Sequence, residues 1–169
     1  IHAGGNYRRV VELVQSGAVG EIHEVHVWVN ATYGGKERPA DTPPVPAGLH
    51  YDLWLGPVAP RPYSPQYLPI NWRHWWAFGG GALADFGCHF MDLPRWALDL
   101  HHPVTVEAEG PAVHPDSAPP WLIVRYEFPE RVHLGAKWPA LKLTWYHGGK
   151  YPGHLIDPEL YQKWKGGVL

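Results

Sequence analysis

Cysteine is nearly absent from this sequence: Cys88 is the one cysteine in 169 residues, so an internal disulfide is excluded. No run approaches the roughly 18 consecutive apolar residues of a membrane span and no signal peptide opens the chain, so we expect a soluble, cytoplasmic protein with no membrane partner. Basic residues number 14 against 16 acidic ones and form no stripe, which argues against nucleic acid as a partner.

A dinucleotide-binding pattern is also missing. Such a pattern needs a strand, a G-x-G-x-x-G turn that meets the pyrophosphate, and an acidic residue about twenty positions later for the ribose. The glycine groups of this chain lack that spacing and those flanks: Gly4-Gly5, Gly34-Gly35, Gly79-Gly80-Gly81, Gly148-Gly149 and Gly166-Gly167. We therefore expect no Rossmann domain here and no NAD(P) bound by this chain.

What the chain does contain is proline, glycine and tryptophan, at 19, 19 and 10 residues. A chain of this length fits one domain with a real core, residues 1–169. Prolines concentrate in residues 31–70, which we interpret as a loop region that holds neither a sheet nor a long helix, ordered by its aromatic side chains. Flat tryptophan faces suit the C–H faces of sugar rings, although most tryptophans in proteins are core anchors.

Hydrophobic periodicity indicates an α+β fold. Asn6 is placed to cap a helix that stops at Ser16-Gly17. Runs rich in β-branched and aromatic residues predict strands at 21–30, 105–109, 121–128 and 141–147. In the first of these, the aliphatic residues form one face against the core, and His26 and Trp28 lie on the other. We expect an open, mostly antiparallel sheet of about four strands with two or three helices on one face.

The most specific chemistry lies between Asn71 and Leu98, where a tryptophan-rich segment leads through three glycines into a helix from Ala82 to about Leu93. Asp85, His89 and Asp92 fall within about 60° of one another on one face of that helix. Spacing of four puts the Asp85 carboxylate within reach of the His89 ring, as needed to orient a general base. The same spacing also suits a simple surface pair. Pro94 must kink or end the helix.

The run from Gly79 to Asp92, GGGALADFGCHFMD, resembles the GGGxLxDxGxHxxD signature of the Gfo/Idh/MocA oxidoreductases. Residues 6–22, NYRRVVELVQSGAVGEI, and 52–57, DLWLGP, are similar to two further segments of that family. The resemblance implies part of a C-terminal α/β substrate domain for sugars or cyclitols, whose NAD(P) belongs to a separate Rossmann domain. Because the family's E-K-P lysine also has no counterpart here, we expect no hydride transfer by this chain alone.

Candidate roles follow for the residues around the helix. His89 would take the proton of the substrate hydroxyl and Asp85 would orient it, as the resemblance implies. We expect the substrate to be walled by Trp72, Trp75 and Trp76. Hydrogen bonds to its hydroxyls are expected from Arg73 or His74, and His26 is a further pocket candidate.

Two other functions stay open. A hydrolase of cyclic esters, a lactonase, would reuse Asp85 and His89 without nicotinamide, and Asp85, His89 and Asp92 would suit Ca²⁺ or Zn²⁺ as a helper. A non-catalytic carbohydrate-binding or oligomerisation module needs only the tryptophans and a sheet edge. Since residues 167–169 resemble the beginning of a strand, we expect an exposed edge and a homo-oligomer formed through it.

Overall fold

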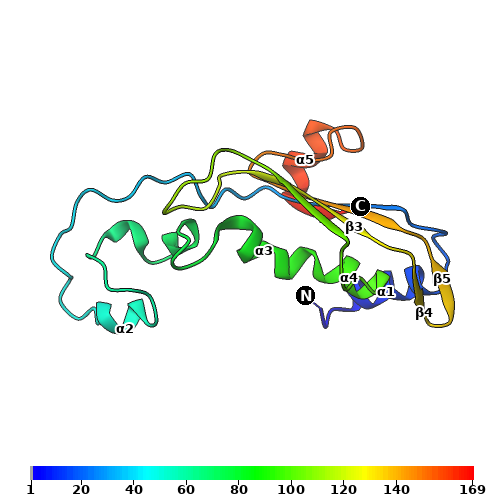
Figure 1. Ribbon diagram of the computed structural model, residues 1–169, viewed down its shortest axis with the longest axis horizontal. Helices are drawn as coiled ribbons and strands as arrows, with labels where there is room; N and C mark the ends of the chain where they lie inside the picture. The colour runs from blue at the N-terminus through cyan, green and yellow to red at the C-terminus, as the bar shows by residue number, and fades with distance from the viewer. Residues whose placement is uncertain (1) are drawn as a thin grey trace.

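The computed structural model describes residues 2–169, and five of their segments pair into one open sheet (Figure 1). These are β1 Glu24–Val29, β2 Thr105–Glu109, β3 Leu122–Phe128, β6 Leu141–His147 and β7 Gly166–Val168, in the order β2-β3-β6-β1-β7. β1 and β6 run parallel, and the other neighbours are antiparallel. The predicted α+β class is confirmed, with a mixed sheet and one strand more than expected.

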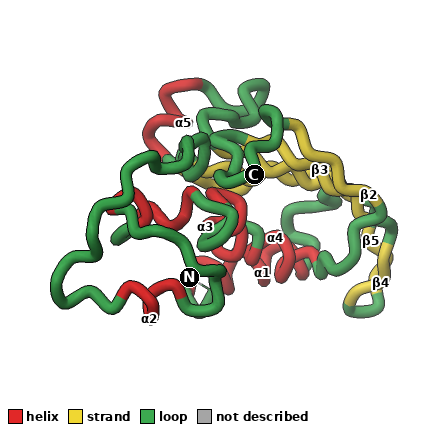
Figure 2. Tube along the Cα trace, turned by 60° about the vertical axis from the view of Figure 1, so that its left-hand side comes forward, coloured by secondary structure: helices red, strands yellow, loops and turns green. Residues whose placement is uncertain are grey.

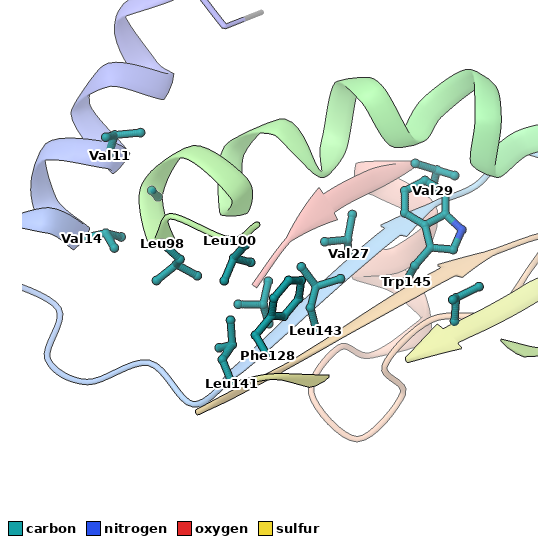
Figure 3. Close-up of a cluster of buried hydrophobic side chains, with 13 residues drawn as sticks. Val11, Val14, Val27, Val29, Leu98, Leu100, Phe128, Leu141, Leu143 and Trp145 are labelled. Atoms are coloured by element: carbon teal, nitrogen blue, oxygen red, sulfur yellow. The ribbon is translucent and has the colours of Figure 1, made fainter. Parts of the chain in front are cut away.

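One face of the sheet carries three helices, α1 Gly5–Gln15, α3 Gly81–Phe90 and α4 Asp92–Leu98 (Figure 1). Figure 3 shows Val11 and Val14 of α1 and Leu98 of α4 directed toward Val27 and Leu143 of the central strands. Full burial of each such side chain contributes about 1.5–3 kcal/mol. Leu83, Phe86 and Phe90 of α3 pack against the same apolar layer, which fixes where α3 lies relative to the sheet.

The opposite face is covered by α5, Pro158–Trp164, a helix that the sequence analysis did not predict (Figures 1 and 2). Its start carries a recognisable signal: Asp157 accepts a hydrogen bond from the Leu160 N–H at 2.8 Å, and Pro158 occupies the first turn. Trp28 is fully buried on this face and stacks on Trp164 at 6.4 Å. The expectation that β1 packs on the core through one face only is therefore wrong, because this central strand is covered on both sides.

A hairpin of β4 Arg131–His133 and β5 Ala136–Trp138 extends the sheet region and was also not predicted. Its two-residue turn has positive φ at Leu134 (51°) and Gly135 (79°), as a type I′ turn requires. Arg131 anchors the hairpin by donating from Nε to the Leu98 carbonyl at 2.7 Å. Because a leucine occupies the first turn position, the turn lacks the Asn-Gly or Gly-Gly sequence that usually indicates such a hairpin.

The proline-rich stretch 31–70 extends away from the strands (Figure 2). Its described elements are the five-residue helix α2, Tyr51–Leu55, and the short 3-10 helix η1, Pro65–Tyr67. Its aromatic rings pack on one another: the centre of the Tyr51 ring lies 5.7 Å from the centre of the Trp54 ring and 5.3 Å from that of Tyr63. Order in this loop comes from aromatic packing, since proline denies it a regular hydrogen-bonded backbone.

β2 forms one edge of the sheet, and all five of its residues are exposed. Within residues 2–169 it pairs with β3 alone, so its outer backbone groups face solvent. Self-association through such an edge stays a prediction. None of the helices in the described part of the chain has the length and apolar character needed to cross a bilayer.

Candidate functional site

The glycine turn before α3 is tightly packed and has a backbone conformation that favours glycine. Gly80 and Gly81 have φ of 69° and 80°, a region that side chains rarely enter. A Cβ on Gly81 would lie 2.5 Å from the Ala118 Cβ and 2.9 Å from the Tyr33 carbonyl oxygen. Both positions therefore require glycine, and the turn sets the direction in which α3 begins.

Gly79 brings the preceding 3-10 helix η2, Asn71–His74, back against this turn. A Cβ on Gly79 would come within 2.6 Å of the Arg73 Cα and 2.9 Å of the Trp72 ring. This close approach carries Arg73 over the first turns of α3, where its Nε donates to Asp85 Oδ1 at 2.9 Å. The two side chains are only 24% and 20% exposed, so the pair lies partly out of water.

Two aromatic rings flank the Arg73 guanidinium. Its central carbon lies 4.3 Å from the centre of the Trp72 ring and 5.7 Å from that of Tyr33. Tyr33 in turn stacks on Phe86 of α3 at 5.9 Å. From the sequence, Tyr33 is one of the aromatic residues expected to order the 31–70 loop, but not a site residue, because it lies about forty residues before Arg73 and no local pattern links the two.

His89 is exposed and follows Asp85 by one turn of α3. Within residues 2–169 no hydrogen bond joins the two side chains, so the predicted orientation of His89 by Asp85 is not formed in this structure. Instead the Asp85 carboxylate is held by Arg73, whose permanent charge and fixed position make it the stronger partner. The backbone carbonyl of His89 accepts from the Tyr7 hydroxyl at 2.9 Å, which ties α1 to this helix.

Asp92 does not lie on the same helix as Asp85 and His89, because α3 ends at Phe90. Pro94 has no N–H for the Phe90 carbonyl, so the chain bends at Met91 and α4 begins at Asp92, with Pro94 in its first turn. The Asp92 carboxylate pairs with His2 Nδ1 at 2.7 Å. In the described residues no three His, Cys, Asp or Glu side chains gather closely enough to hold a metal ion, so Asp85, His89 and Asp92 do not form a ligand set for Ca²⁺ or Zn²⁺.

Of the other residues of the tryptophan-rich segment that were predicted to contact the substrate, some are buried in the core and one is exposed. Trp75 is 1% exposed and packs against Tyr67 at 5.3 Å. His74 is buried and accepts from the Gly34 N–H at 2.7 Å, and burial lowers its pKa. Trp76 is exposed but donates to the His114 carbonyl. Of the predicted wall residues, the structure places only Trp72 against the Arg73–Asp85 pair.

His26 lies on the other face of the sheet. It is 4% exposed, lies within 3.1 Å of the Tyr146 hydroxyl and meets the His154 ring edge-on. Burial lowers its pKa. The structure therefore does not bring His26 together with Asp85 and His89.

The start of α3 does not fit the pyrophosphate of NAD or NADP. Dinucleotide binding at a helix N-terminus needs a strand that leads into the glycine turn. Here the 3-10 helix η2 leads into the turn. That this chain binds no NAD(P) stays a prediction.

A comparison of the sequence with models of known protein families identifies the family of this domain. The family model for the C-terminal alpha/beta domain of the Gfo/Idh/MocA oxidoreductases matches residues 4–135. Fold and match together define the class of protein as the C-terminal domain of an oxidoreductase. The chain belongs to the Gfo/Idh/MocA family. A comparison with curated proteins finds no match.

Proposed function

We propose that this chain is the substrate-binding side of an oxidoreductase that acts on sugars or cyclitols. The observation that supports the proposal is the partly buried Arg73–Asp85 pair between aromatic rings, one helical turn from the exposed His89. A guanidinium donates and a carboxylate accepts, so together they suit neighbouring hydroxyl groups. The face of Trp72 suits the C–H face of a ring.

Oxidation of an alcohol removes a proton from the hydroxyl and a hydride from the carbon that bears it. His89 is the group that takes the proton in this proposal, because an imidazole nitrogen can accept a proton and the side chain is open to solvent. The hydride acceptor is assigned to another domain or chain, since no strand leads into the glycine turn before α3 as a dinucleotide site requires. Arg73 and Asp85 hold and orient the hydroxyls.

Nothing in the geometry favours the lactonase alternative. Activation of water by His89 calls for a carboxylate on its ring or for a metal beside it. Asp85 is paired with Arg73, and Asp92 with His2. We therefore propose the oxidoreductase function and not the hydrolase function.

Replacing Arg73 by alanine is expected to weaken the binding of glucose or myo-inositol by about tenfold or more, equivalent to about 1.4 kcal/mol. The reason is the loss of a charged donor and release of the Asp85 carboxylate. Isothermal titration calorimetry of the two ligands measures the effect. Arg125→Ala is the matched control, because Arg125 pairs with Glu109 in an exposed ion pair on the sheet.

The proposal fails if neither ligand gives a saturating titration with the unchanged chain. It also fails if Arg73→Ala and Arg125→Ala bind with equal affinity. Far-UV circular dichroism of each variant verifies that the comparison is made between folded proteins.

A further inference from the structure

A cavity of about 390 Å³ lies in the proline-rich loop between residues 38–42 and 59–67. It shares no residue with the Arg73, Asp85 and His89 surface. Its volume falls in the range of about 300–1,000 Å³ that is usual for small-molecule sites. The side chains that matter for its chemistry are Arg38, Asp41, Thr42, Arg61, Tyr63 and Tyr67.

Arg61 is the unusual member. Its Nε is shielded from solvent and has no hydrogen-bond partner within residues 2–169. A buried donor on a charged group that lacks an acceptor costs about 1–3 kcal/mol or more. A ligand therefore cannot use this Nε, whereas the two terminal nitrogens of the same guanidinium are not shielded in this way and form no ion pair within residues 2–169.

The guanidinium of Arg61 is held in place before any ligand arrives. Its central carbon lies 4.9 Å from the centre of the Phe78 ring and 6.0 Å from that of Tyr67. Phe78 packs on Trp54 at 4.9 Å, and Tyr67 packs on the buried Trp75. Because these rings fix the plane of the guanidinium, little conformational entropy remains to be lost on binding.

The second arginine of the cavity is already neutralised. Arg38 donates from Nε to Asp116 at 3.0 Å, and this hydrogen bond lowers the pKa of Asp116. Asp41 also lines the cavity and makes no ion pair in the described structure. Its negative charge disfavours a dianion, whereas a monoanion can satisfy Arg61.

We propose that this cavity binds the carboxylate of a small organic acid. The two terminal nitrogens of Arg61 each donate a hydrogen bond to one carboxylate oxygen, a geometry that planar guanidinium and carboxylate groups share. Thr42 and Tyr63 supply hydroxyl groups on the cavity wall. The aromatic platform beneath Arg61 is what makes the site rigid.

The test is a titration of the 169-residue chain with cyclohexanecarboxylate, observed through the Arg61 Nε–H resonance by ¹H–¹⁵N NMR at fixed ionic strength. We expect this resonance to shift and saturate at millimolar acid, and not to shift with cyclohexanemethanol, the uncharged analogue. Inorganic phosphate is expected to bind more weakly because of Asp41. Arg61→Lys keeps the charge but loses the planar fork, so its affinity should fall about tenfold or more.

Arg125→Lys, on the sheet, is the control and should bind like the unchanged chain. Several results would overturn the proposal: no saturation, an equal shift with the alcohol, tighter binding of phosphate, or unchanged affinity in Arg61→Lys. The NMR titration uses the unchanged chain, so it decides the matter even if the variant fails to fold. Since neither ring compound is a sugar or cyclitol, the outcome is independent of the function proposed for Arg73.

Discussion

Gly81→Ala is expected to destabilise the fold by about 3 kcal/mol or more. A left-handed backbone costs a residue with a Cβ roughly 1–2 kcal/mol, and overpacking adds about 1–3 kcal/mol. The added Cβ would lie 2.5 Å from the Ala118 Cβ, far inside contact distance. Urea unfolding followed by circular dichroism measures the loss. In a domain of this size the melting temperature should fall by about 6–12 °C.

Gly87→Ala is the matched control in the same helix. A Cβ there would meet only Leu83 Cδ1, at 3.5 Å, an ordinary van der Waals contact. Alanine has the better helix propensity by about 1 kcal/mol, so stability should stay the same or rise. If Gly81→Ala is as stable as the unchanged chain, the turn is not the constraint that we describe.

Acidification from pH 6.5 to pH 4 is expected to remove about 3 kcal/mol of stability through His147. Burial lowers the pKa of His147 from 6.5 to about 4, and the side chain is 1% exposed. Its Nδ1 accepts from the Trp145 Nε1–H at 2.9 Å, so a proton on Nδ1 would face another donor. Protonation therefore favours the unfolded state.

The direction follows from the order of the two pKa values. Above pH 6.5 the ring is neutral in both states and the full stability is present. As pH falls below 6.5 the unfolded chain takes up the proton first and stability declines, until the folded chain is protonated near pH 4. Urea unfolding at half-unit steps from pH 7.5 to pH 4 measures this slope.

His147→Gln should flatten the slope, because glutamine does not titrate in this range. Part of the slope will remain, since burial also lowers the pKa of His26 and His74. An identical pH dependence in His147→Gln and the unchanged chain would contradict the assignment.

Local patterns in the sequence located most of the sheet. The predicted strands at 105–109 and 141–147 coincide with β2 and β6, and residues 122–128 of the predicted 121–128 form β3. The alternation of apolar and polar residues and the content of β-branched residues are properties of a few neighbouring residues. They therefore predict strands without knowledge of the rest of the chain. The hairpin of β4 and β5 escaped because its turn places Leu134 at positive φ, against the usual preference.

The sequence by itself determined most of the strands of the main sheet, the glycine-led helix with Asp85 and His89, and the family, because each of these depends on residues that are neighbours in the chain. Only the tertiary structure decided the partners of those side chains. Arg73 reaches Asp85 across the glycine turn, Tyr33 comes from a distant loop, and α5 covers Trp28. His26 lies against Tyr146 and His154 on that same face of the sheet. Such contacts join residues that are far apart in the chain, and they depend on how whole elements pack against one another.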